Sequence, residues 1–172
     1  MKKLLLIALL ICFVCFVFNM SLKAQDEPTV QKGAQMLSYK LGYGWSWGGN
    51  RIGFIPGIFS YDAGVSKLGP GTLTLGGMFM FSIRSYYMNL YFAFKGAWHY
   101  NFRVPKFDAF VGLTAGPKIP IYKFSDQRVI DWIGVNSYFG ASYYFTDHFG
   151  LTTEVGLGTV NWYLFGMSFK IK

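Results

Sequence analysis

Hydrophobic and polar positions alternate along much of the chain, most regularly at residues 161–172. Every second residue of this stretch is large and apolar: Tyr163, Phe165, Met167, Phe169 and Ile171. The positions between them are mostly small or polar. Because successive side chains of a strand point to opposite faces, the pattern predicts a β-strand with one apolar face. Such a strand is unstable alone, so it needs a sheet to join and an apolar medium, either protein core or lipid.

The same period-two alternation recurs in seven earlier segments, each broken by Gly, Pro, Asn or Asp. No convincing amphipathic helix follows Ala34. The sequence therefore predicts eight strands, at about 35–47, 58–67, 72–83, 86–100, 107–115, 133–146, 149–158 and 161–172. We expect tight turns at 69–70 and 147–148 and the longest irregular connection at Gly116–Asp131.

The composition of the less apolar face favours lipid as the medium outside the sheet. That face consists mainly of Gly, Ser, Thr, Asn and Tyr with single charges, and the whole chain is only 14% charged and 20% aromatic. A half-buried sheet in water normally carries many charges on its outer face, and this one would be poorly soluble. Lipid requires every backbone polar group to be paired, so the sheet must close. We therefore predict an all-β fold, an eight-stranded antiparallel up-and-down transmembrane β-barrel at residues 34–172.

The expected orientation follows from placing the start of the barrel in the periplasm. The turns near 69–70, 101–106 and 147–148 are then periplasmic, and the connections near 48–57, 84–85, 116–131 and 159–160 face outward. The longest connection is then extracellular, as is usual in such barrels. This makes Gly116–Asp131 the candidate contact loop.

The first residues have the layout of a secretory signal peptide. Met1-Lys2-Lys3 is basic, and Leu4–Phe18 is an apolar run too short to span a bilayer comfortably. We expect a signal peptide at 1–24 that is cleaved between Ala24 and Gln25, the alternative being a retained anchor helix. Residues 25–33 are polar and are expected to form a mobile lead-in.

Removal of this leader also settles the cysteine and charge content of the remainder. Cys12 and Cys15 both lie in the leader, so the other 148 residues can form no disulfide and no thiolate metal site. These residues carry 13 basic and eight acidic side chains, a net charge of +5 without a basic arm or helix face. Nucleic acid is therefore not expected as a partner.

The candidate chemistry lies in the predicted barrel interior. Four charges, Lys40, Asp62, Lys95 and Glu154, fall on the inward face at about the same distance from the periplasmic end. A buried charge is costly unless it is paired, so we expect these residues to form a lumen charge belt. The remaining histidines are His99, on the inward face with no serine assignable beside it, and His148, in a turn. No phosphate-binding loop and no metal-ligand spacing occurs, so we predict no cofactor, no metal and no catalytic residue.

The end of the chain resembles the assembly signal of outer-membrane β-barrel proteins, through Gly166, Phe169 and Ile171. Leu164 and Lys172 depart from that pattern. The segments 96–100, 143–158 and 165–170 are similar to a family of small outer-membrane β-barrel proteins, and the overall pattern resembles OmpA/OmpX-type eight-stranded barrels. The resemblance implies location in the bacterial outer membrane, with its lipid and lipopolysaccharide as surroundings and the barrel-assembly machinery as a partner during insertion.

A non-enzymatic structural or surface-interaction role is the leading functional expectation, because the sequence carries no recognisable catalytic group. The lumen should be plugged by side chains, since eight strands enclose little more than their own side chains. Three alternatives remain open: a lipid-modifying barrel enzyme, a narrow passive pore, and a soluble lipocalin-like binder with the two faces reversed. The sequence identifies no extracellular ligand.

Overall fold

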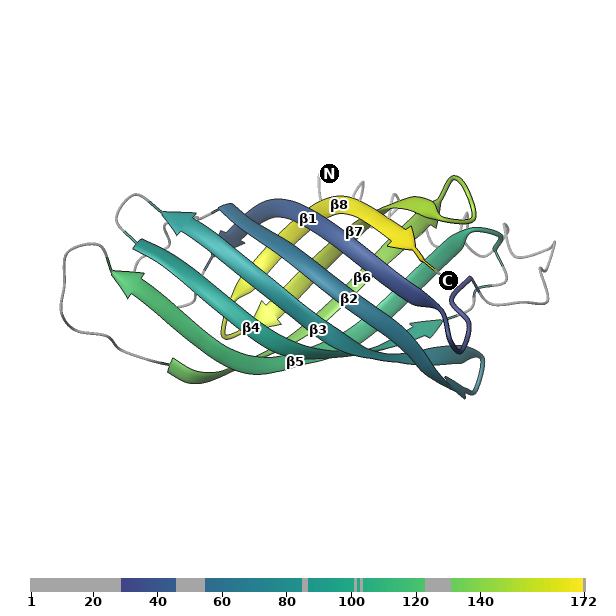
Figure 1. Cartoon of the computed structure of the whole chain (residues 1–172), viewed down its shortest axis with the longest axis horizontal. Coiled ribbons are helices and arrows are strands. Elements are labelled where there is room, and N and C mark those ends of the chain that lie inside the picture. The colour runs from purple at the N-terminus through teal and green to yellow at the C-terminus, as the bar shows by residue number, and fades with distance from the viewer. Residues whose placement is uncertain are drawn as a thin grey trace, which may run out of the picture.

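The computed structural model describes residues 29–45, 55–84, 87–100, 102, 104–122 and 131–171. Eight antiparallel strands close into a barrel in chain order (Figure 1). The strands are β1 (Gln35–Trp45), β2 (Ile55–Leu68), β3 (Gly71–Arg84), β4 (Tyr87–Tyr100), β5 (Phe107–Tyr122), β6 (Asp131–Tyr144), β7 (Phe149–Gly158) and β8 (Asn161–Lys170). The predicted fold class is confirmed, whereas the expected signal peptide and its cleavage at Ala24–Gln25 lie outside the described residues.

Pairing between the first and last strands leaves the sheet without a free edge. The β1–β8 register runs from Met36 opposite Lys170 to Trp45 opposite Asn161. Closure satisfies the backbone groups that an open sheet would leave unpaired in lipid. No helix in the described part of the chain is long and apolar enough to cross a bilayer.

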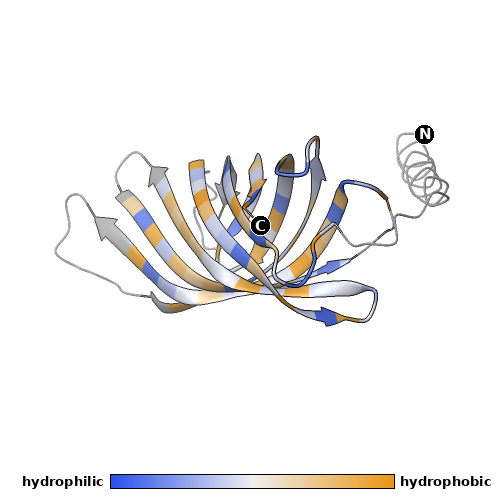
Figure 2. Ribbon diagram, turned by 45° about the vertical axis from the view of Figure 1, so that its right-hand side comes forward, coloured by the Kyte–Doolittle hydropathy of each residue, from blue (hydrophilic) through white to orange (hydrophobic). Residues whose placement is uncertain are grey.

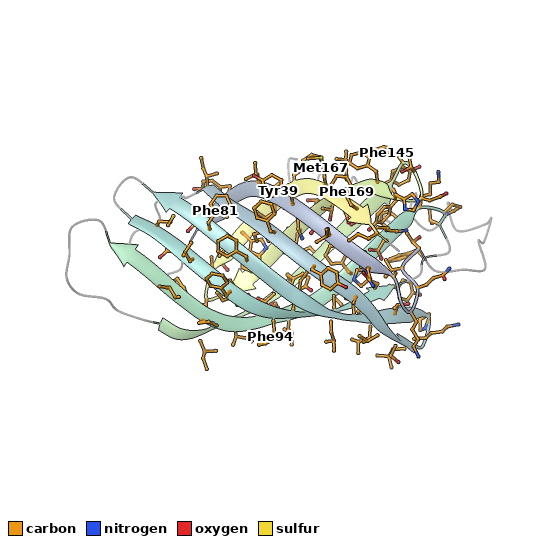
Figure 3. The ribbon with its side chains drawn as sticks, in the orientation of Figure 1. Tyr39, Phe81, Phe94, Phe145, Met167 and Phe169 are labelled. Carbon is orange, nitrogen blue, oxygen red and sulfur yellow. The ribbon has the colours of Figure 1, made fainter. Side chains whose placement is uncertain are left out.

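The outside of the barrel is apolar all the way round. Every strand contributes exposed large apolar side chains, and three of them, Phe94, Ile133 and Leu113, are 84%, 72% and 62% exposed. Hydropathy alternates residue by residue along the strands (Figure 2), and the side chains of one set project from the outer surface (Figure 3). No described outward-facing side chain of the strands is charged. An apolar surface of this extent is unsuited to water and matches the hydrocarbon layer of a membrane.

Two predicted connections are shorter than expected because strands extend into them. β5 continues to Tyr122 and β6 begins at Asp131, so the prediction of an irregular stretch at Gly116–Asp131 is wrong except for 123–130, which lie outside the described residues. The strand passes Pro117 through a register shift between Gly116 and Lys118. Bulges of this kind accommodate a proline, which cannot donate to the ladder. Similarly, β2 begins at Ile55, inside the connection expected at 48–57.

One end of the barrel holds the start of β1, the end of β8 and the connections β2–β3, β4–β5 and β6–β7. We call this end the terminal mouth and the other end the far mouth. The tightest turn at the terminal mouth is Gly69-Pro70, where Gly69 has a φ of 58°. A glycine with positive φ at the first turn position is typical of the two-residue hairpins that match strand twist.

Candidate functional site

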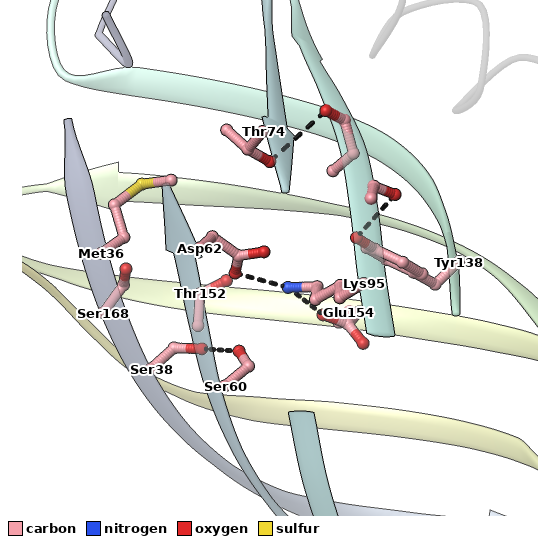
Figure 4. A network of polar contacts seen from close by, with 12 residues as sticks. Met36, Ser38, Ser60, Asp62, Thr74, Lys95, Tyr138, Thr152, Glu154 and Ser168 are labelled. Atoms are coloured by element: carbon pink, nitrogen blue, oxygen red, sulfur yellow. Dashed lines mark hydrogen bonds and ion pairs between the residues drawn. The ribbon is translucent and has the colours of Figure 1, made fainter. Parts of the chain in front are cut away.

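Four charged side chains from four strands meet inside the barrel. Lys40, Asp62, Lys95 and Glu154 are 2%, 5%, 6% and 1% exposed. Lys40 Nζ lies 2.5 Å from Glu154 Oε2, and Lys95 Nζ lies 2.9 Å from Asp62 Oδ2 and 3.9 Å from Glu154 Oε2. The charges therefore alternate in sign along one connected chain, part of which Figure 4 shows. The structure thus brings together all four residues of the expected belt.

Glycines beside the charged residues make room for this charge belt. Asp62, Gly76 and Lys95 lie opposite one another on three adjacent strands, so the ion pair passes over a position without a side chain. Lys40 lies opposite Gly166 in the same way, and a Cβ on Gly166 would come within 2.0 Å of the Tyr39 carbonyl oxygen. The small residues of the inward face thus allow long charged side chains to fit a narrow bore.

Neighbouring side chains satisfy most of the remaining polar groups of the belt. The Trp162 indole donates from Nε1 to Glu154 Oε1 at 3.1 Å, and Lys95 Nζ lies 5.0 Å from the centre of the Tyr138 ring. Asp62 Oδ1 is buried and has no hydrogen-bond partner among the described residues. Burial with near-complete pairing makes each charge dependent on its partner, since an isolated charge in this environment is strongly disfavoured.

Hydroxyl groups and aromatic rings fill the bore on both sides of the belt. Towards the far mouth, Tyr91 donates to the Gly134 carbonyl at 2.9 Å, and Asn136 Nδ2 donates to the Tyr91 hydroxyl at 3.1 Å. Towards the terminal mouth, inward-facing hydroxyl groups form hydrogen bonds in pairs: Ser38 with Ser60, Ser142 with Thr152, and Tyr144 with Ser168. A cavity of about 20 Å³ remains among these groups, room for about one water molecule.

A buried His–Asp pair lines the same cavity. His99 Nδ1 lies 2.8 Å from Asp108 Oδ2, and the side chains are 7% and 3% exposed. His99 was predicted to face inward, but its pairing with Asp108 was not predicted, because the contact runs diagonally between β4 and β5, where His99 is opposite Phe110. Among the described residues no serine bonds to His99, and no group of three His, Cys, Asp or Glu could hold a metal ion. His148 is an exposed turn residue whose Nδ1 lies 3.1 Å from the Lys170 carbonyl oxygen.

The segment Thr29–Gly33, here called the mouth strap, crosses the terminal mouth. A mobile lead-in was expected at 25–33, but its described part packs against the barrel instead, with Val30 only 2% exposed. Its hydrogen bonds reach four strands: Thr29 Oγ1 to the Phe107 carbonyl, Thr72 Oγ1 to the Val30 carbonyl, Lys170 Nζ to the Thr29 carbonyl, and Gly33 N to the Gly64 carbonyl. Most of these bonds use the backbone of the strap, so side-chain polarity could not predict them.

The three residues of the expected assembly signal lie at the end of β8. Gly166 faces inward against β1, and Phe169 is 42% exposed, with its ring centre 5.3 Å from that of Phe149. Ile171 lies just beyond the strand, where its amide donates to the Gln35 carbonyl. These positions are consistent with a strand that packs on lipid on one face and on β1 along one edge.

Comparisons with known proteins support the fold and go no further. No protein-family model matches the chain, and no curated protein matches it. A de novo designed transmembrane β-barrel aligns with a TM-score of 0.59 at 16% identity, covering 82% of this chain and 98% of the designed one. Ail, the attachment invasion locus protein of Yersinia pestis, aligns with a TM-score of 0.52 at 9% identity, covering 82% of this chain and all of Ail. The chain is thus a barrel of the transmembrane type.

Proposed function

We propose that this protein resides in the outer membrane of a bacterium as a non-catalytic barrel with a structural or surface-interaction role. The observation that carries the proposal is the inverted distribution of side chains: apolar residues without charge outside, and paired charges and hydroxyls inside. The predicted signal peptide at 1–24 supports export across the inner membrane. With the terminal mouth in the periplasm, the far mouth faces the surroundings of the cell.

A lumen closed to ions is part of this proposal. The charge belt crosses the bore from β1 and β2 to β4 and β7, and the mouth strap lies across the terminal mouth. Hydrated ions would have to separate charges 2.5–3.9 Å apart, which low-dielectric surroundings oppose. The function of such a barrel would then depend on its outer surface and its far-mouth connections and not on transport through the lumen.

The proposed surroundings are outer-membrane lipid and lipopolysaccharide, with the barrel-assembly machinery as a partner during insertion. The likeness to Ail makes attachment to an external surface a reasonable form of the interaction role, because Ail is an attachment protein of the same fold. The contacts with the surroundings would lie at the far mouth, where the connection 123–130 joins the end of β5 to the start of β6.

A lipid-modifying enzyme is the second candidate, and one observation favours it. A histidine held by an aspartate, as His99 is by Asp108, is the arrangement that orients a general base. Both side chains lie inside the barrel, however, where an acyl chain outside cannot reach them. The pair therefore fits a structural role better than a catalytic one.

Three measurements on a deletion strain and on purified protein separate these functions. Purified protein in planar bilayers should show no steady conductance, and a stable ohmic channel would instead support a pore. Mass spectrometry of lipid A and phospholipids should be unchanged by the deletion, whereas a missing acyl or headgroup modification restored by wild type but not by His99→Ala would support the enzyme. Loss of envelope integrity or of adhesion to surfaces on deletion, restored by the wild-type gene while the lipid profile stays unchanged throughout, is the result expected for the proposed function.

A further inference from the structure

Two neighbouring rows of outward side chains cross five strands on one side of the barrel. The register places Phe169, Leu37, Tyr61, Gly77 and Phe94 in the first row, from β8 through β1, β2 and β3 to β4. The second row contains Met167, Tyr39, Phe59, Phe79 and Phe92 on the same strands. Figure 3 shows Tyr39, Met167 and Phe169 together on this outer face.

Gly77 leaves a gap in the first row. A Cβ added there would have only the Ala93 carbonyl oxygen within 4 Å, at 3.8 Å, so the space above it is open. The gap also explains the unequal exposure of two neighbouring rings on β4. Phe94, opposite Gly77, is 84% exposed, whereas Phe92, whose ring centre is 4.9 Å from that of Phe79, is 44% exposed.

The two rows enclose a hollow of about 480 Å³ on the outer surface. Its walls include Leu37, Tyr39, Phe59, Tyr61, Phe79 and Phe169, and no charged residue lines it. The hollow is continuous with the apolar surface that the fold presents to a bilayer. An occupant must therefore be apolar along its length, which fits a hydrocarbon chain and excludes a charged headgroup.

We propose that this hollow, here called the Gly77 groove, binds one acyl chain of a membrane lipid and holds it longer than the lipids around it. The inference rests on the proposed function, because it requires the outer face to lie in a bilayer. Aromatic walls on both sides of the groove give a flexible chain contacts along its length. Dispersion contacts are individually small but add up along a methylene chain.

Native mass spectrometry of protein extracted from membranes in mild detergent tests this proposal. Wild type should carry one phospholipid molecule per barrel. Gly77→Phe should reduce this retained fraction about tenfold, as expected for the loss of about two methylene contacts. The open space above Gly77 allows the new ring to fit the folded barrel. The matched control is Ala115→Phe, because Ala115 also faces outward, on β5 and outside the groove, and this change should leave the retained lipid unchanged.

A second variant protects the test against misfolding of the first. Phe59→Ala removes a wall of the groove instead of filling it, and it should also lower lipid retention while the barrel keeps its folded gel mobility. Barrels without retained lipid in wild type, or equal retention in Gly77→Phe and Ala115→Phe, would overturn the proposal. Two barrels held together through this face, with no lipid present, would assign the groove to a second copy instead. Recovery of the chain in the soluble fraction of cells would contradict the proposed function itself, so the two failures are distinguishable.

Discussion

Lys40 and Lys95 both lie within 4 Å of Glu154 in the charge belt, but the structure predicts different consequences for the two lysines when the Glu154 charge is removed. Glu154→Gln removes the negative charge but keeps the side-chain volume and the oxygen that accepts from Trp162. Lys40 then loses its only counter-charge within 4 Å among the described residues, whereas Lys95 keeps Asp62 at 2.9 Å. Breaking a buried ion pair by changing one partner costs about 3–5 kcal/mol, so the barrel should lose about 3 kcal/mol of unfolding free energy.

A second change on the partner side tests whether the unpaired charge causes this loss. Lys40→Met added to Glu154→Gln removes the orphaned ammonium group, and it should restore about 1–3 kcal/mol. Lys95→Met added to Glu154→Gln should restore less, because it leaves Asp62 without its partner. Removing both charges should therefore be better tolerated at Lys40 and Glu154 than at Lys95 and Glu154.

Reversible urea unfolding in phospholipid vesicles measures these differences. Tryptophan fluorescence and the gel mobility of unheated samples report the folded fraction, and the denaturation midpoints give the differences in free energy when the slopes agree. A stability of Glu154→Gln equal to that of wild type, or a Lys40→Met change that restores no more stability than Lys95→Met, would show that the unpaired Lys40 charge is not costly.

Three further predictions concern the outer face, assembly and the mouth strap. Val155→Lys should cost about 2–4 kcal/mol near the bilayer midplane, whereas Leu68→Lys at the rim should cost about 0–1 kcal/mol, and equal costs in the same unfolding assay would contradict the assigned faces. Phe169→Ala should lower the amount of heat-modifiable barrel in outer membranes, and unchanged levels would argue against an assembly role. Val30→Gly should expose the bore at the terminal mouth, so that a cysteine at Ser168 in refolded protein reacts faster with a water-soluble thiol reagent; equal labelling with and without the change would mean that the strap closes nothing.

The faces of the strands were predictable because hydrophobic alternation directly reports which side chains share a face. Phe165, Met167 and Phe169 were placed together on one apolar face, and the structure exposes all three on the outside of the barrel. Strand ends were less predictable. Pro117 and Pro120 predicted a connection after Ala115, but β5 continues through both prolines, with a shift of its register against β6 beside Pro117.

The sequence predicted which charged side chains face into the barrel, because the position of a residue along its strand determines its face. It did not predict which of these side chains contact one another, because that depends on the register and the three-dimensional arrangement of the strands. The sequence did not show whether Lys40 or Lys95 is the partner of Glu154. The structure shows that Lys40 is the nearer of the two, at 2.5 Å against 3.9 Å. The same limitation hid the diagonal contact between His99 and Asp108. The mouth strap was missed for a different reason, since backbone groups make most of its hydrogen bonds.

The apolar outside of the barrel should lie in the outer membrane of the cell. Separation of inner and outer membranes by buoyant density, followed by extraction with alkaline carbonate, measures this in cells that express the full chain. The protein should be found with the outer membranes, resist extraction and migrate as a compact, heat-modifiable band. Recovery as a soluble protein in the periplasm or medium would contradict it, because the exposed apolar face would then have to be covered by something other than lipid.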